Sequence, residues 1–74
     1  MTYTVLSKAN CPYSQAAIKF LRERVNNLVI YTAGKDFELE EFKERYGKDS
    51  TFPRIYENRN FIGGYEQLVE YFRA

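Results

Sequence analysis

The chain has 74 residues, of which 45% are hydrophobic and 18% aromatic, and its formal net charge is +1. A chain of this length forms one domain, here residues 1–74, and buries only about 60% of the surface that its unfolded form exposes. The balanced charge argues against a surface for nucleic acid or anionic membranes, and no apolar run approaches the roughly 20 residues of a membrane span. We therefore expect a small soluble domain that is monomeric.

The chain has one cysteine, Cys11, and no histidine. These counts exclude an internal disulfide framework and His-based catalysis, and they argue against a structural zinc site. No positively charged, apolar leader opens the sequence, so we expect a reducing intracellular compartment, the cytoplasm.

Alternating residues from Tyr3 to Ser7 predict a first strand. A helix is expected to begin at Cys11, because Pro12 is tolerated in a first helical turn and apolar residues then recur at helical spacing. The positions expected to face the core are Ala17, Phe20, Leu21 and Val25, with Lys19, Arg22 and Glu23 turned outward.

A short apolar, β-branched run from Leu28 to Thr32 predicts a second strand. A second helix is expected to follow, capped by Asp36 and ending at Gly47, with an acidic first turn that suits the helix dipole. Its inward face would carry Leu39, Phe42 and Tyr46.

The segments Ile55-Tyr56-Glu57 and Phe61-Ile62 flank the turn-forming residues Asn58-Arg59-Asn60 and predict a hairpin. Gly63-Gly64 then leads into a last helix, whose apolar residues are Leu68, Val69 and Phe72. The element order is therefore β-α-β-α-β-β-α. A parallel unit with a right-handed crossover would join an antiparallel hairpin in one mixed sheet.

Cys11 is the residue whose position points most directly to chemistry. A cysteine at the start of a helix faces free backbone N–H groups and the positive end of the helix dipole, and Lys8 adds a cation three residues earlier. We therefore expect the pKa of its thiol to lie well below about 8.5. A thiolate of low pKa leaves quickly when another thiol attacks its mixed disulfide, which suits a cysteine that is loaded and unloaded repeatedly. The alternative is a buried, inert cysteine, which the flanking loop sequence does not favour.

Three short motifs together resemble those of the glutaredoxin family. They are Cys11-Pro12-Tyr13-Ser14 after the first strand, Thr51-Phe52-Pro53 before the hairpin and Gly63-Gly64 before the last helix, in the family's order. The resemblance covers nearly the whole chain and implies a thioredoxin-like α/β fold, with a four-stranded mixed sheet flanked by three helices. It also implies a thiol–disulfide oxidoreductase of electron transport and cell redox homeostasis, with glutathione as co-substrate and no metal.

Ser14 departs from the two-thiol members of the family, which have a second cysteine at this position. Without that thiol, Cys11 cannot resolve its own mixed disulfide. The resemblance therefore implies a one-cysteine cycle, in which Cys11 takes glutathione from a glutathionylated protein or small disulfide and a second glutathione removes it. Ser14 could also satisfy a free N–H of the first helical turn, and a serine introduced in place of a resolving cysteine would give the same sequence.

The resemblance further implies how glutathione binds. Lys8 would meet the glycine carboxylate and Tyr13 would flank the sulfur; the alternative for each is an ordinary surface residue. A cis bond before Pro53 would turn the Phe52 backbone outward, where it can pair with the tripeptide as an added strand would; the alternative is a trans proline that opens an edge strand.

The γ-glutamyl carboxylate would lie at the start of the last helix, unless Gly63-Gly64 is only a tight turn. The expected glutathione contacts beyond Lys8 and Tyr13 are Thr51, Phe52, Pro53, Gly64, Tyr65, Glu66 and Gln67. Here the chain departs again, because the family commonly has a small residue and then Asp where this chain has Tyr65-Glu66.

Two other functions stay open at this point. One is an iron–sulfur carrier, in which two chains and two glutathiones supply four thiolates to a cluster; the family's cluster carriers usually have Gly-Phe after the cysteine, whereas Pro12-Tyr13 favours the redox enzyme. The other is a module that binds glutathione without turnover.

Overall fold

A single mixed sheet organises the chain, and the computed structural model describes all residues, 1–74. The four strands lie side by side in the order β2-β1-β3-β4. In chain order the elements are β1 Tyr3–Ser7, α1 Pro12–Arg22, β2 Leu28–Thr32, α2 Leu39–Tyr46, β3 Arg54–Glu57, β4 Asn60–Gly63 and α3 Tyr65–Arg73. The predicted element order and the mixed sheet are confirmed.

The sheet is built around β1. This strand runs parallel to β2, with Tyr3 opposite Leu28, and antiparallel to β3. Its residues alternate as predicted, because Tyr3, Val5 and Ser7 are buried while Leu6 is only half-buried. One face of the sheet is therefore closed and the other more open.

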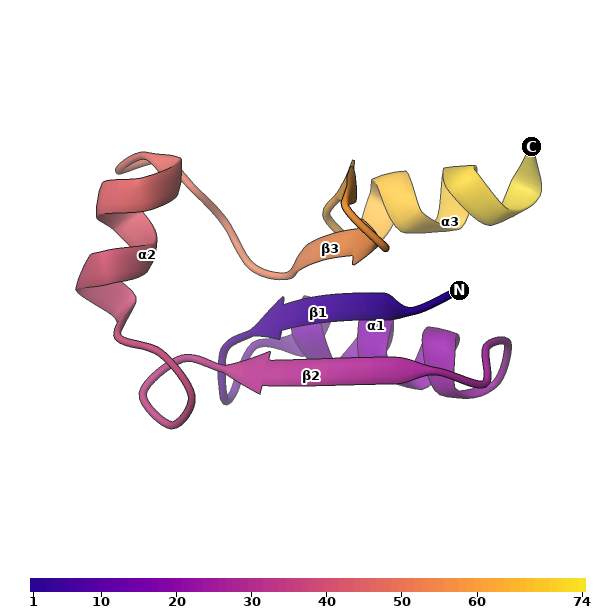
Figure 1. The fold of residues 1–74 in the computed structure, drawn as a ribbon, viewed down its shortest axis with the longest axis horizontal. Helices are drawn as coiled ribbons and strands as arrows, with labels where there is room; N and C mark the ends of the chain where they lie inside the picture. Colours follow the sequence, from indigo (N-terminus) through magenta and orange to yellow (C-terminus); the bar gives the residue numbers. More distant parts are fainter.

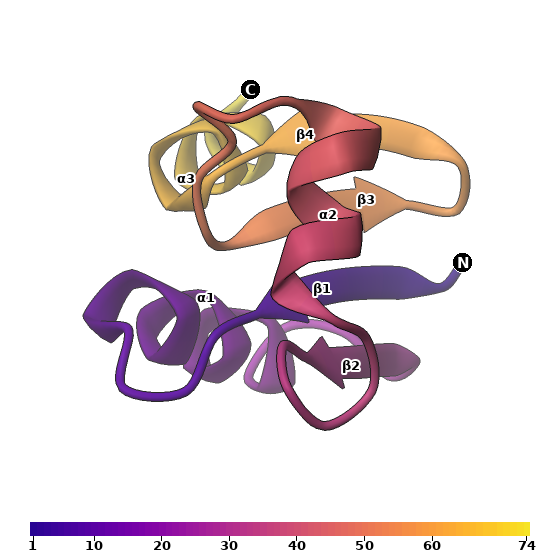
Figure 2. The ribbon, with the colours of Figure 1, turned by 90° about the vertical axis from the view of Figure 1, so that its left-hand side faces the viewer.

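Helices α1 and α3 cover the closed face, and Figure 2 shows both on the same side of the strands. Their apolar stripes meet the inward strand residues in one core, which consists of Tyr3, Val5, Ala17, Ile18, Leu21, Ile55 and Leu68. None of the helices is both long enough and apolar enough to cross a membrane.

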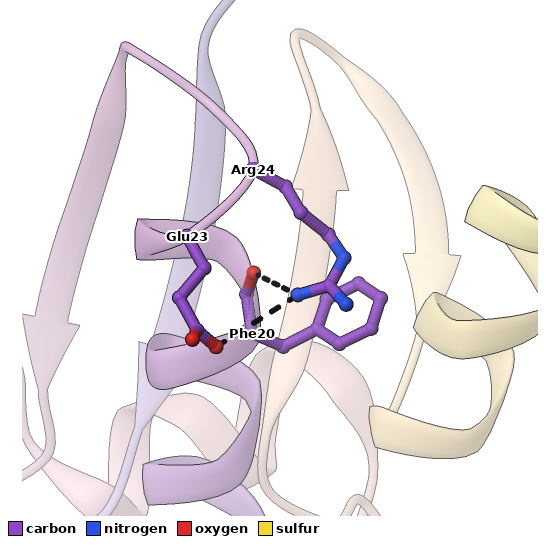
Figure 3. A network of polar contacts seen from close by, with 3 residues as sticks. All are labelled: Phe20, Glu23 and Arg24. Carbon is purple, nitrogen blue, oxygen red and sulfur yellow. Dashed lines mark hydrogen bonds and ion pairs between the residues drawn. The ribbon is translucent and has the colours of Figure 1, made fainter.

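The end of α1 differs slightly from the prediction. The helix stops at Arg22, and Val25 lies beyond it, although its side chain still packs against the core. Arg24 closes this end: its guanidinium lies 3.7 Å from the centre of the Phe20 ring, and it donates to the Phe20 carbonyl at 3.0 Å (Figure 3). The carboxylate of Glu23 lies 3.9 Å from the same guanidinium nitrogen.

Helix α2 lies beyond the carboxyl ends of β1 and β2 (Figures 1 and 2). Aromatic packing attaches it there, since Phe42 is buried and its ring stacks on that of Phe52 at 4.4 Å between centroids. The helix ends at Gly47 as predicted, and the φ of 106° at this residue favours glycine.

The predicted cap of α2 is wrong. The helix begins at Leu39, and the N-cap residue is Glu38. The carboxylate of Asp36 instead accepts the N–H of Thr32 at 2.8 Å, while the Asp36 N–H donates to the Thr32 carbonyl at 2.8 Å. Asp36 is therefore used to close the turn that follows β2, a role that Asp side chains take as readily as capping.

A two-residue turn, Asn58-Arg59, joins β3 to β4. Asn58 has a φ of 53°, which Asn tolerates better than most residues. Asn60, which the sequence analysis places in the turn, is the first residue of β4 and pairs with Glu57.

Candidate active site

Cys11 is the N-cap residue of α1. Its backbone is extended, and Pro12 follows it in the first helical turn. The loop before it is closed by the Cys11 N–H, which donates to the Lys8 carbonyl at 3.3 Å, and by Asn10 with a φ of 63°. The free thiol is partly exposed, so that a disulfide in solution can approach it; this is not the buried, inert cysteine of the alternative reading.

The surroundings of Cys11 lower the pKa of its thiol from the ordinary value. Burial acts in the opposite direction and is the largest single contribution, but the groups that favour the thiolate outweigh it. These groups are the hydroxyl and the N–H of Ser14, the N–H of Tyr13 and, with a smaller effect, the charge of Lys8. The predicted direction is confirmed, and hydrogen bonds contribute more to it than the cation does.

Ser14 is fully buried, and its position explains part of that effect. Its Oγ accepts the N–H of Lys8 at 3.3 Å, across the loop that precedes α1. The expected bond to an N–H of the first helical turn is therefore wrong. Because a hydroxyl accepts with its lone pairs, the Ser14 proton stays available to donate to the Cys11 sulfur. Ser14 therefore stabilises the thiolate of Cys11.

The segment Thr51-Phe52-Pro53 faces Cys11 across the site. The Phe52–Pro53 peptide bond is cis, as the resemblance implies. The Phe52 carbonyl lies 3.9 Å from the Cys11 Sγ, which donates to it in the thiol form. The Phe52 N–H makes no hydrogen bond within the chain, and Thr51 is exposed. This piece of backbone is therefore free to pair with an extended peptide.

Lys8 and Tyr13 lie on either side of the cysteine in sequence, and both are exposed. The Tyr13 side chain is 60% exposed, and its ring lies 6.2 Å from that of Tyr65 at the start of α3. Tyr13 and Tyr65 thus form an aromatic surface near the thiol. The Lys8 ammonium has no carboxylate partner in the chain.

The start of α3 is less open to an anion than the sequence suggests. Gly63 has a φ of 129°, and a Cβ there would lie 2.8 Å from the side chain of Gln67. The Gly64 N–H is already used, because it donates to Gln67 Oε1 at 2.9 Å. The next three N–H groups, those of residues 65–67, make no hydrogen bond within the chain, but Glu66 adds a negative charge to the same turn.

Arg54, which the sequence offers after Lys8 as the next candidate to hold a carboxylate of glutathione, lines a groove of about 440 Å³ next to the site. The groove runs between the 47–51 segment and the Gly63-Gly64 turn. Arg54 follows Pro53 directly in the sequence, and the alternation of β3 places it on the opposite face from the buried Ile55.

The comparisons with known proteins show to which family the chain belongs. The family model for glutaredoxin matches residues 3–62. The chain belongs to the glutaredoxin family. Its activity class is therefore thiol–disulfide oxidoreduction, and glutathione is the co-substrate that this family uses. A search of curated proteins found none that matches the chain.

Solved structures of glutaredoxins share the thioredoxin-like fold of the chain. The dithiolic glutaredoxin 2-C-Grx1 of Trypanosoma brucei brucei is 28% identical, with a TM-score of 0.78 over 97% of this chain and 77% of that one. The holo form of glutaredoxin C1 from Populus tremula x tremuloides is 19% identical, with a TM-score of 0.75 over 96% of this chain and 73% of the other. Reduced Escherichia coli glutaredoxin is 23% identical, with a TM-score of 0.65 over 99% and 94%.

Proposed function

We propose that the chain is a glutathione-dependent oxidoreductase that removes glutathione from mixed disulfides by a one-cysteine mechanism. The observation that carries this proposal is the pairing of one partly exposed thiol of lowered pKa with a buried serine, not a second cysteine, three residues later.

The first step is the attack of the Cys11 thiolate on the glutathione sulfur of a glutathionylated protein or small disulfide. A Cys11–glutathione disulfide forms, and the substrate leaves as a thiolate that takes a proton from water. In the second step the thiolate of a second glutathione attacks the glutathione sulfur of this intermediate. Oxidised glutathione is released, and the Cys11 thiolate is regenerated.

Ser14 makes the second step depend on an outside thiol, since it has no sulfur with which to displace the bound glutathione. The low pKa of Cys11 favours this step, because Cys11 is then the leaving group. A cycle of this kind needs abundant reduced glutathione, so we place it in a reducing compartment such as the cytoplasm.

Glutathione would lie between the two loops that face Cys11. Its cysteine residue would pair with the free backbone of Phe52, and Tyr13 would cover the sulfur. The glycine carboxylate would reach Lys8, whose ammonium has no carboxylate partner in the chain. The γ-glutamyl end would then extend past Thr51 toward Gly64.

Turnover of the mixed disulfide between glutathione and 2-mercaptoethanol tests the proposal, with oxidised glutathione as the measured product. We expect turnover by the chain, none by Cys11→Ser, and a single glutathione adduct on Cys11 when the second glutathione is withheld. A chain that forms this adduct but never releases it would be a glutathione-binding module, and the proposed function would be wrong.

A further inference from the structure

The second face of the sheet carries a groove beside α2, the α2 groove, which the proposed cycle does not use. Leu6 and Tyr31 lie opposite each other in β1 and β2 and form its floor, and no helix lies over the strands on this side (Figure 1). Phe37, Phe42 and Tyr46 line it from the segment before α2 and from α2 itself. Its volume of about 540 Å³ is large enough for several side chains of a partner.

The floor of the α2 groove is apolar and open to solvent. Tyr31 is 45% exposed, and Leu6 and Phe37 are only half-buried. Single exposed apolar residues are common on any protein surface, but several that line one hollow are typical of an interaction site. The floor therefore suits aliphatic or aromatic side chains of another molecule.

The rim of the α2 groove is acidic. Asp36, Glu41 and Glu44 belong to it, and Arg45 is the only cation among its lining residues. All four side chains are exposed, and Arg45 forms no ion pair with any of the carboxylates. The rim is thus negative in a chain whose net charge is +1. A partner segment with cations on either side of apolar residues is complementary to both the rim and the floor.

The α2 groove lies close to the reactive thiol. The ring of Phe42 stacks on that of Phe52 at 4.4 Å between centroids, and the Phe52 carbonyl lies 3.9 Å from the Cys11 Sγ. Leu6 precedes Cys11 by five residues, which span at most about 18 Å when fully extended. A protein whose cysteine reacts at Cys11 can therefore place a neighbouring segment in the groove, whereas a small disulfide has no such segment.

We infer that the α2 groove docks a segment of the glutathionylated protein substrate, one in which lysine or arginine side chains flank aliphatic or aromatic ones. The inference rests on the proposed function and names the class of protein that this cycle favours. A second copy of the chain is a poorer occupant, because a two-fold contact through the groove would bring the same carboxylates face to face.

The test uses two glutathionylated peptides that differ only in charge. Each has one cysteine, joined by six glycine and serine residues to the segment Lys-Leu-Lys-Phe-Lys or Glu-Leu-Glu-Phe-Glu, and each is made with the segment before or after the cysteine. A linker of six residues extends to about 20 Å, so it spans the distance from Cys11 to the groove. The readout is the ratio of the second-order rate constants, basic over acidic, for release of the peptide thiol in single turnover.

We expect the unmodified chain to prefer the basic peptide in at least one order, although its net charge of +1 would by itself favour the acidic one. Glu41→Gln combined with Glu44→Gln should lower the ratio by about three- to twentyfold, as for the loss of two exposed ion pairs. Tyr31→Thr should also lower it, because the docked apolar side chains lose a ring. Glu40→Gln combined with Glu70→Gln removes two exposed carboxylates outside the groove, and this matched control should keep the ratio.

Other results would overturn the inference. If the control lowers the ratio as much as the Glu41 and Glu44 variant does, only net charge matters and the groove docks nothing. If the unmodified chain releases both peptides equally fast in both orders, the docking site does not exist but the proposed function stands. If neither the peptides nor the mixed disulfide of glutathione with 2-mercaptoethanol are turned over, the proposed function fails and the inference with it. If sedimentation shows a dimer that Tyr31→Thr dissociates, the occupant is a second copy and the inference is wrong.

Discussion

Replacement of Ser14 by alanine tests whether this residue supports the reactive thiolate or merely fills space. The substitution removes the hydroxyl that favours the charged form of Cys11, and it removes the acceptor of the Lys8 N–H. The backbone N–H groups of Tyr13 and Ser14 remain, so the thiolate keeps part of its stabilisation. We therefore expect a raised pKa for the Cys11 thiol.

The size of the effect follows from the number and kind of bonds lost. A hydrogen bond to a charged group contributes about 1.5–3 kcal/mol, and each 1.36 kcal/mol corresponds to a factor of ten. Because Ser14 is fully buried, water cannot readily replace its hydroxyl. The ratio of thiolate to thiol at a given pH should therefore fall about ten- to hundredfold in Ser14→Ala.

Alkylation by iodoacetamide measures this ratio, because only the thiolate reacts. In the unmodified chain we expect the rate to begin its decline at a lower pH than for an ordinary thiol, and in Ser14→Ala the decline should begin at a higher pH than in the unmodified chain. Gln15→Ala, a change at an exposed neighbour in the same helical turn, should leave the profile unaltered. Superimposable profiles for Ser14→Ala and the unmodified chain would refute the role given to the hydroxyl.

Three further predictions concern other parts of the molecule. Lys8→Gln should raise the KM for glutathionylated substrates by up to about fivefold, because an exposed ion pair contributes only about 0.2–1 kcal/mol; an unchanged KM would place the glycine carboxylate elsewhere. Ser14→Cys should form an intramolecular disulfide under oxidised glutathione and reduce protein disulfides, whereas a variant that stays reduced would show that position 14 is not the resolving position. Burial, with the hydrogen bond to Glu57 and its charge, raises the pKa of Tyr3 from 10.0 to about 12. The contribution of Tyr3 to the free energy of unfolding should therefore be fully present below pH 10 and should fall by roughly 2–3 kcal/mol toward pH 12, as measured by urea unfolding. The same fall in Tyr3→Phe would contradict the assignment to Tyr3.

The fold was predictable because the sequence patterns that indicate its strands and helix ends are local. The alternation of Tyr3 to Ser7 and the glycine after α2 each fix a strand or a helix end without reference to the rest of the chain. The cap of α2 was not predictable in the same way. Asp36 can close a turn or begin a helix, and only the nearby Thr32 N–H decides between the two.

The residues of the site that belong to a short sequence motif were predictable, whereas the contacts that form only in the folded chain were not. The position of Cys11 at a helix start follows from Pro12, but the contact between Ser14 and the Lys8 N–H depends on how the loop closes. The setting of Arg54 depends on three rings that come from three different elements, α2, β3 and β4. No pattern within one segment shows that these rings meet.

The topology of the sheet explains why the reactive groups gather at one end of the molecule. Strand β1 runs toward Cys11, β3 runs antiparallel to it and β4 antiparallel to β3. The end of β1, the start of β3 and the end of β4 therefore lie at the same edge, and these positions carry Cys11, Phe52-Pro53 and Gly64 respectively. This is the end that faces the viewer in Figure 2.

The opposite end of the sheet carries a group of hydrogen bonds that stabilises the fold. There the carboxylate of Glu57 accepts the hydroxyls of Tyr3 at 3.0 Å and Tyr71 at 2.5 Å and so ties α3 to two strands. Because these bonds form on the far side of the core from Cys11, substitutions in this group should change unfolding while leaving the alkylation of Cys11 unchanged. Substitutions of Ser14 should change the pH profile of alkylation as well as the free energy of unfolding, since Ser14 is buried and accepts the Lys8 N–H. The Glu57 group can therefore be altered without changing the reactivity of Cys11, because the buried core separates the two.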